Sequence, residues 1–134
     1  MTKEFCTYEQ AMALKELDFD EPCFGTYLSS LQSDWKVYEL ILEMGMNEEF
    51  EDNRNVYLLE GACSAPLYQQ AFRFFREKHN LVFNFISYNI VKPGEYHWSI
   101  TWNDEAKASG IVKTYEEAEL ECLNTLIKIV KSKT

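Results

Sequence analysis

The sequence predicts a single α+β domain over residues 1–134, in which three helices pack on a mainly antiparallel sheet. Three helix-start signals each precede a stretch with helical spacing of apolar residues, and aromatic-rich segments lie between the last two stretches. A length of 134 residues is typical of one domain. Apolar residues make up 46% and aromatic residues 15%, which excludes disorder from lack of apolar surface.

The first helix is expected over residues 8–17. Thr7 fits its N-cap, and Gln10 stands three residues later, which is the spacing of a capping box. The stretch "DFDEPCFG" ends the helix, because Pro22 restricts the backbone of the residue before it. An apolar stripe recurs in steps of three, at Ala11, Leu14 and Leu17.

The segment 24–60 has the weakest pattern. "CFGTYLSS" and "KVYELILEMGM" are rich in β-branched and aromatic residues, which favours strands. Trp35, Tyr38 and Leu42 also fit a helical period. We expect "NEEFEDNRN" to form an acidic polar loop and "VYLLEG" to form a short strand.

A second helix is expected over residues 64–79. Ser64 fits its N-cap, and Pro66 would occupy the first turn, where its missing N–H costs nothing. One side of this helix is apolar, with Leu67, Ala71, Phe74 and Phe75.

Two strands are expected next, in "LVFNFISYNI" and "YHWSITWND", with a turn at Pro93 and Gly94 between them. In the second strand, polar residues alternate with Trp98, Ile100 and Trp102, which predicts one polar face and one buried face. A third strand is expected in "SGIVK".

The last helix is expected over residues 115–131, with Thr114 as its N-cap and Glu117 completing a capping box. Its apolar side combines a central stripe with flanking residues that widen it. The stripe is Leu120, Leu123, Ile127 and Val130, and the flanking residues are Ala118, Cys122, Leu126 and Ile129.

From residue 64 onward the expected order is helix, strand, strand, strand, helix, an order that also occurs in the double-stranded-RNA-binding domain. In that domain the start of the last helix carries lysines that contact phosphates. Here the same position holds carboxylates, which argue against direct nucleic-acid binding. They are Glu116, Glu117, Glu119 and Glu121.

The net charge of -9 is unevenly distributed along the chain. Residues 1–60 carry 14 acidic and 4 basic side chains, a net charge of -10, whereas residues 61–134 carry 8 acidic and 9 basic ones, a net charge of +1. The acidic half either imitates a phosphate backbone and occupies a nucleic-acid-binding partner, or is simply solvated. The acidic interaction surface would comprise Asp18, Asp20, Glu21, Glu48, Glu49, Glu51 and Asp52.

Two further groups are candidate binding residues. Gln69, Arg73 and Arg76 recur at i, i+4 and i+7 of the second helix, where arginine side chains can hold an anion. Tyr88 and Tyr96 flank the turn between two strands and can stack on a base or nucleotide. The alternatives are arginines that pair with the acidic half or face solvent, and aromatic residues that fill the core.

No catalytic residue, cofactor or metal site is expected. Neither His79 nor His97 has a partner spaced for a nucleophile–base pair, and the glycines form no phosphate-binding loop. The four cysteines are widely spaced, so we expect free, mostly buried thiols in a cytoplasmic protein. No apolar run approaches the length of a membrane span, and the N-terminus lacks the layout of a signal peptide.

Three stretches, "TYEQAMALKELDFDEPCFG", "APLYQQAFRFFREKHNL" and "KTYEEAELECLNTLIKIV", carry a resemblance. In their order and spacing they resemble a group of small uncharacterised proteins encoded by bacteriophages and prophages of Bacteroides-type bacteria. The resemblance covers helices and their approaches. It implies a phage-type accessory protein that acts in the bacterial cytoplasm, and it assigns no activity and no site residue.

From these patterns we expect a non-enzymatic protein that binds, and thereby inhibits, a host protein through its acidic half. One alternative is a binder of a small anionic ligand such as a nucleotide, held by the arginines near the tyrosines. The other is a module similar to the double-stranded-RNA-binding domain.

Overall fold

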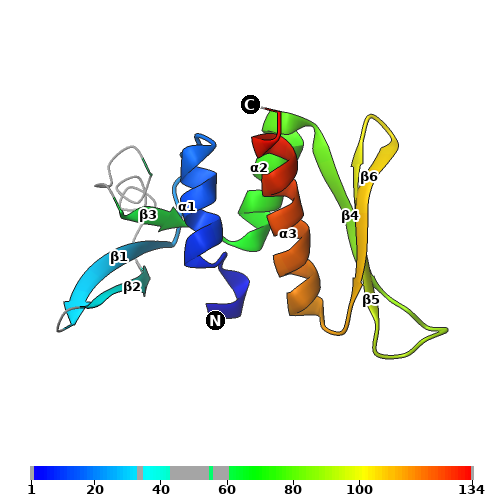
Figure 1. Cartoon of the computed structure of the whole chain (residues 1–134), viewed down its shortest axis with the longest axis horizontal. Helices are drawn as coiled ribbons and strands as arrows, with labels where there is room; N and C mark the ends of the chain where they lie inside the picture. Colours follow the sequence, from blue (N-terminus) through cyan, green and yellow to red (C-terminus); the bar gives the residue numbers. More distant parts are fainter. Residues whose placement is uncertain (1, 33–34, 43–54, 56–60, 134) are drawn as a thin grey trace. The chain divides into compact units, whose positions relative to one another are not determined.

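The structure is a computed structural model that describes residues 2–32, 35–42, 55 and 61–133. The chain forms two compact units, Met1–Leu67 (unit 1) and Tyr68–Thr134 (unit 2), which are coloured along the sequence in Figure 1. Three α-helices and two antiparallel sheets confirm the predicted α+β class. A single domain over 1–134 stays a prediction. The acidic excess coincides with unit 1, because the seven residues from 61 to 67 carry no charge.

Unit 1 begins with a 3-10 turn, Thr2–Glu4, and the helix α1, Tyr8–Glu16. The predicted capping box is confirmed at this helix. The Thr7 hydroxyl accepts a hydrogen bond from the Gln10 N–H at 3.2 Å, and the Gln10 side-chain oxygen accepts one from the Thr7 N–H at 3.0 Å. Ala11 and Leu14 are fully buried, so α1 packs through the predicted apolar stripe.

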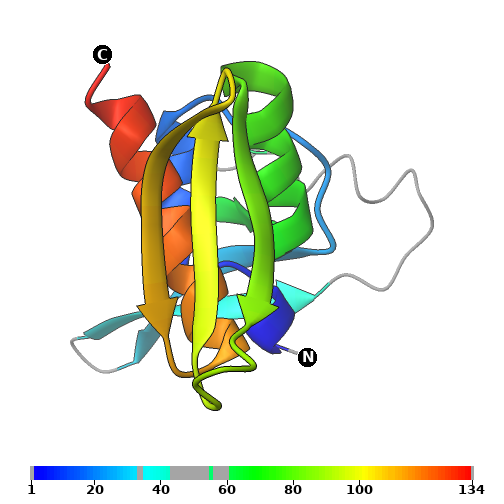
Figure 2. The same ribbon diagram turned by 90° about the vertical axis from the view of Figure 1, so that its right-hand side faces the viewer.

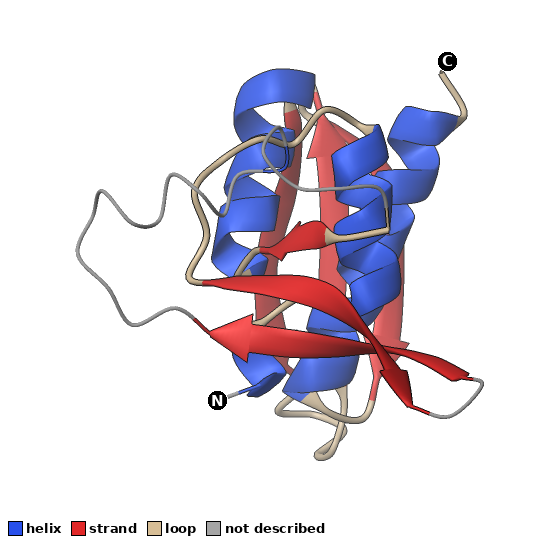
Figure 3. Ribbon diagram, turned by 90° about the vertical axis from the view of Figure 1, so that its left-hand side faces the viewer, coloured by secondary structure: helices blue, strands red, loops and turns tan. Residues whose placement is uncertain are grey.

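The sheet of unit 1 contains β1 (Gly25–Gln32), β2 (Trp35–Leu42) and β3 (Cys63–Ala65), in the order β2-β1-β3 (Figure 3). Both neighbour pairs are antiparallel. The strands predicted from the two aromatic-rich stretches of residues 24–46 are therefore confirmed where the structure describes them. The predicted acidic loop and most of the strand predicted in "VYLLEG" lie outside the described residues.

The predicted start of the second helix at residue 64 is wrong. The helix α2 is Tyr68–His79, and Ser64 belongs to β3, where it pairs with Thr26 of β1. Pro66 also precedes the helix, and its carbonyl accepts a hydrogen bond from the Cys6 N–H at 2.9 Å. The backbone of Ser64 and Pro66 is therefore used in long-range pairing, although local sequence signals predict a helical turn there.

Unit 2 continues with β4 (Leu81–Tyr88), β5 (Tyr96–Trp102), β6 (Glu105–Val112) and α3 (Tyr115–Lys131). The strands form an antiparallel sheet in the order β4-β5-β6. The predicted order of helix, three strands and helix is confirmed, and the third strand begins earlier than expected. Figure 2 looks onto the outer face of this sheet, and α2 and α3 both lie behind it.

The core of unit 2 forms between the two helices and the inner face of the sheet. Trp98 and Ile100 of β5 are buried there, with 4% and 0% of their surfaces exposed, as predicted, whereas Trp102, predicted for the same face, is half-buried. Leu120, predicted to belong to the core stripe of α3, is 40% exposed. The buried side of α3 consists of Ala118, Cys122, Leu123, Leu126, Ile127 and Val130.

Both edges of this sheet are irregular. The pairing of β4 with β5 shifts register between Asn84 and Ser87. The pairing of β5 with β6 shifts between Ile100 and Thr101, where Lys107 is the extra residue of β6. Each edge strand therefore carries a bulge, which interrupts its row of backbone hydrogen-bonding groups.

Candidate interaction site

Three tyrosines meet at one end of unit 2. Tyr88 ends β4 and Tyr96 begins β5; the two are partners across the strands, with ring centroids 5.3 Å apart and an angle of 62° between the ring planes. Tyr115, the first residue of α3, lies 6.3 Å from Tyr96 at 85°. Figure 1 shows the β4–β5 turn and the start of α3 at the same end of the unit. We call Tyr88, Tyr96 and Tyr115 the tyrosine cluster.

The rings of the tyrosine cluster are held in place but remain accessible. Tyr88 is 49% exposed and Tyr115 is 46% exposed, whereas Tyr96 is half-buried between them. The Tyr88 hydroxyl accepts a hydrogen bond from the Gly94 N–H at 3.1 Å. Gly94 has φ +92°, a conformation that glycine adopts without strain, so the turn can bring the Gly94 N–H to the Tyr88 hydroxyl.

The turn between β4 and β5 presents aliphatic side chains to solvent. The Asn89 side-chain oxygen accepts hydrogen bonds from the N–H groups of Val91 (3.0 Å) and Lys92 (3.2 Å), and the Asn89 N–H donates to the Glu95 carbonyl at 2.9 Å. This Asx-type arrangement fixes the loop backbone. Ile90 and Val91 are 85% and 89% exposed. Two aliphatic residues so fully exposed beside exposed aromatic rings form a candidate interaction surface.

The charges around the tyrosine cluster are mainly negative. Residues 88–96 and 113–119 together hold four carboxylates and two lysines. Burial and the nearby charges of Glu119 and Glu116 raise the pKa of Tyr115. One carboxylate oxygen of Glu95 is buried and has no hydrogen-bond partner in the part of the chain that the structure describes. The surroundings therefore favour a cation over an anion.

The predicted cationic stripe of Gln69, Arg73 and Arg76 lies on α2, a different element from those that carry the tyrosine cluster. Gln69, Arg73 and Arg76 all lie on the exposed side of α2. Arg76 is in the last turn of α2, next to the start of β4, whereas Tyr88 ends β4. A strand of eight residues spans roughly 26 Å. The structure brings Tyr88 and Tyr96 together and places Arg76 near the opposite end of β4 from Tyr88.

The predicted acidic interaction surface is described in part. Asp18, Asp20 and Glu21 follow α1 and are exposed or half-buried. Asp18 has φ +67°, which places it in the turn that ends the helix. Glu48, Glu49, Glu51 and Asp52 lie outside the described residues, so their gathering into one surface stays a prediction.

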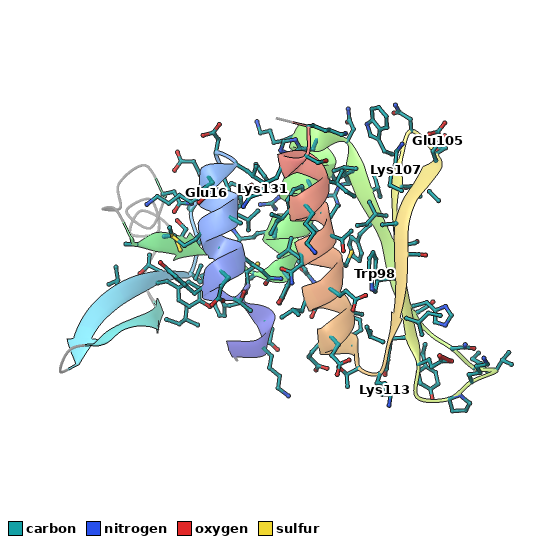
Figure 4. All side chains as sticks on the ribbon, in the orientation of Figure 1. Glu16, Trp98, Glu105, Lys107, Lys113 and Lys131 are labelled. Atoms are coloured by element: carbon teal, nitrogen blue, oxygen red, sulfur yellow. The ribbon has the colours of Figure 1, made fainter. Side chains whose placement is uncertain are left out.

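The opposite end of unit 2 is cationic. The ammonium nitrogens of Lys107 and Lys133 lie 5.0 and 4.5 Å from the ring centre of Trp102. Lys107 also lies 3.5 Å from Glu105, and Figure 4 shows both at the β5–β6 turn. These cations cover an indole that is half-buried, and Lys133 follows the C-terminus of α3, where positive charge is stabilising.

The histidines lie apart from the tyrosine cluster. Burial and the charge of Lys133 lower the pKa of His79, so its ring is neutral near pH 7. The His97 Nε2 atom lies 3.2 Å from the Asn89 side-chain nitrogen on the outer face of the sheet. There His97 lines a shallow hollow of about 330 Å³ with serines from all three strands, Ser87, Ser99 and Ser109.

The cysteines behave as predicted. All four are free and buried. Burial raises the pKa of Cys23, Cys63 and Cys122 to about 12, so these thiols stay protonated. Among the described residues, no group of three or more histidine, cysteine, aspartate or glutamate side chains could hold a metal ion.

Sequence reasoning missed part of this surface. Tyr115 is separated by 19 residues from Tyr96, so no local pattern links it to the strands. The available signal was its position directly after the N-cap Thr114, where helix residues are commonly exposed. The sequence predicts Ile90 as the end of a strand and Val91 as part of the turn, whereas the strand ends at Tyr88 and both residues lie in the exposed turn.

In comparisons with protein-family models, with curated proteins and with solved structures, this chain matches none of them. In the part of the chain that the structure describes, no helix has the length and apolar character needed to cross a membrane.

Proposed function

We propose that this chain is a non-enzymatic accessory protein that binds, and thereby inhibits, a protein of the bacterial host cell. The observation that supports this most is the exposed surface at the β4–β5 turn, where Ile90 and Val91 adjoin the tyrosine cluster. Aromatic residues with two rotatable bonds and a polar tip are common anchors in protein interfaces. Exposed aliphatic side chains gain free energy when a partner buries them.

The partner we propose has a basic surface, such as a host protein that handles nucleic acid. Residues 1–60, which lie in unit 1, carry a net charge of -10, and carboxylates also surround the tyrosine cluster. Opposite charges steer association and suppress binding to wrong partners. The resemblance to phage and prophage proteins supplies the host context of this proposal.

Two alternatives receive less support from the geometry. A small anionic ligand would need the arginines near Tyr88 or Tyr96, and these groups lie on different parts of unit 2. Double-stranded-RNA binding would need cations at the start of α3, which holds Glu116 and Glu117. A thermal-shift screen with nucleotides and a gel shift with duplex RNA at low salt test these alternatives; a clear response in either would replace our proposal.

The proposal is tested by affinity capture from host lysate with three baits. The baits are the wild-type chain, the variant Ile90→Ser/Val91→Ser, and a control, Lys128→Ser, which changes an exposed residue of α3. We expect one or a few host proteins to bind the wild type and the control at low salt. The turn variant should not capture these proteins, and their binding to the wild type should weaken at high salt. Recovery of the same proteins by all three baits, or of none, would contradict the proposal.

A further inference from the structure

We propose that the tyrosine cluster is a binding site for an alkylammonium group, such as the side-chain terminus of a partner's lysine. This inference rests on the proposed function in one respect, because it names the chemistry that the partner presents. It concerns a different property of the site, however, since a free ammonium compound can occupy the site without any partner protein.

The geometry of the rings supports a cation. Tyr96 stands at 62° to Tyr88 and at 85° to Tyr115, with centroid separations of 5.3 and 6.3 Å. Because Tyr88 and Tyr115 are each nearly half exposed, part of each ring is accessible to a ligand. A cation within about 6 Å of a ring centre is attracted by the electrons of the ring face, and tyrosine-lined sites of this kind hold quaternary ammonium groups.

The carboxylates strengthen the same preference. Glu116 and Glu119 lie close enough to Tyr115 to raise its pKa. Glu95 adjoins Tyr96 in sequence and adds a further negative charge at this end of β5. Lys92 and Lys113 offset part of this negative charge and leave it in excess.

The site is also prepared for its ligand before binding. The hydrogen bond from the Gly94 N–H holds the Tyr88 hydroxyl, and the backbone of Tyr115 forms the first residue of a capped helix. Rings that are already ordered lose little conformational entropy when a ligand binds. The exposure of Tyr88 and Tyr115 leaves room for a side chain to approach.

The test is a titration of the full chain, followed by two-dimensional NMR of its backbone amides. The probes are acetyl-trimethyllysine amide, acetyl-lysine amide and a neutral analogue in which a tert-butyl group replaces the trimethylammonium. We expect saturable shifts at residues 88–96 and 113–117 with the trimethylated probe at millimolar concentration, weaker binding of the unmethylated probe, and no saturable shift with the neutral analogue. Sodium chloride at matched ionic strength is the blank.

Two variants separate the role of the ring from that of the fold. Tyr115→Leu removes a partly exposed ring and should weaken binding about tenfold, whereas Tyr115→Phe keeps the ring face and should bind within about twofold of wild type. Glu116→Gln should weaken binding severalfold. Equal binding of the neutral analogue, or equal affinity of Tyr115→Leu and wild type, would overturn the inference.

The outcome also distinguishes this inference from the proposed function. If the trimethylated probe binds but no host protein is captured, the ammonium site stands and the proposed function falls. If a host protein is captured through Ile90 and Val91 but the trimethylated probe gives no saturable shift, the proposed function stands and the ammonium site falls.

Discussion

Trp98 of β5 occupies the space that a side chain at Gly110 of β6 would need. The two residues are partners across the strands, and a Cβ atom added at Gly110 would lie 2.5 Å from the indole nitrogen and 2.6 Å from Glu121 Oε1. The indole is 4% exposed and rigid, so it cannot yield easily. Figure 4 shows Trp98 on the side of the sheet that α3 covers. Gly110 is therefore required for packing.

We expect Gly110→Ala to lower the free energy of unfolding by about 1–3 kcal/mol, the usual cost of overpacking a core. Urea unfolding followed by circular dichroism measures this change. Trp98→Leu should lower the free energy of unfolding by itself. In that background Gly110→Ala should cause a smaller further loss of stability, because the indole no longer occupies the space. Strictly additive effects of the two substitutions would show that they do not compete for space.

The Asn55 side chain should be a major contributor to the stability of unit 1. Its amide nitrogen donates to the Phe19 carbonyl at 2.8 Å, and its oxygen accepts from the Ser64 N–H at 2.8 Å, both in buried surroundings. Asn55→Ala removes both of these buried hydrogen bonds and should cost about 2–5 kcal/mol. The exposed Gln69, which carries the same amide group, gives a control, whose replacement by alanine should change stability by less than about 0.5 kcal/mol. Similar losses in the two variants would contradict this assignment.

The prediction of the second helix illustrates what local sequence signals can and cannot provide. The apolar spacing of Ala71, Phe74 and Phe75 predicts the buried side of α2 correctly, because helical periodicity is a local property. Ser64 and Pro66 also give strong local signals for a helix start. They are overridden by pairing with Thr26 and Cys6, about 40 and 60 residues earlier, which no local pattern encodes.

The candidate site shows the same limit. Tyr88 and Tyr96 flank a Pro-Gly turn, so their proximity follows from the hairpin and is predictable. Tyr115 joins them only because α3 packs on the sheet and starts at the same end. The separation of Arg76 from Tyr88 likewise follows from the antiparallel course of α2 and β4, which the sequence alone does not specify.

The helix caps are expected to have measurable and separable effects. Thr7→Ala and Thr114→Ala each remove a hydroxyl that accepts a hydrogen bond from the N–H three residues later, at 3.2 and 3.1 Å. Each should cost about 1 kcal/mol in urea unfolding, and serine at either position should restore most of it. Thr125→Ala removes a hydroxyl that bonds back to the Glu121 carbonyl and should be nearly neutral. A loss at Thr125 as large as at the caps would argue against this explanation.

Stability should fall in alkaline solution because of the buried thiols. The folded state holds the pKa of Cys23, Cys63 and Cys122 at about 12, whereas an unfolded thiol titrates near 8.5. Above about pH 9 the unfolded state therefore binds fewer protons than the folded state, and the free energy of unfolding decreases as pH rises. The expected slope is up to about 1.4 kcal/mol per pH unit for each thiol.

Urea unfolding at pH 7.5 and pH 10 measures this dependence, and Cys122→Ala provides the comparison. The variant is expected to be less sensitive to pH than wild type by the contribution of one thiol, whatever its stability at pH 7.5. An unchanged difference between the two pH values would show that Cys122 does not contribute.

The bulges in β4 and β6 affect how readily separate copies of the chain can pair through the edges of this sheet. An open three-stranded sheet has two edges at which another chain can add a strand, the first step in the growth of fibrillar aggregates. Here each edge is broken near its middle, at Asn84–Ser87 in β4 and at Lys107 in β6, so a second chain meets no continuous row of donors and acceptors. The two bulges therefore make strand addition at the edges of this sheet less favourable.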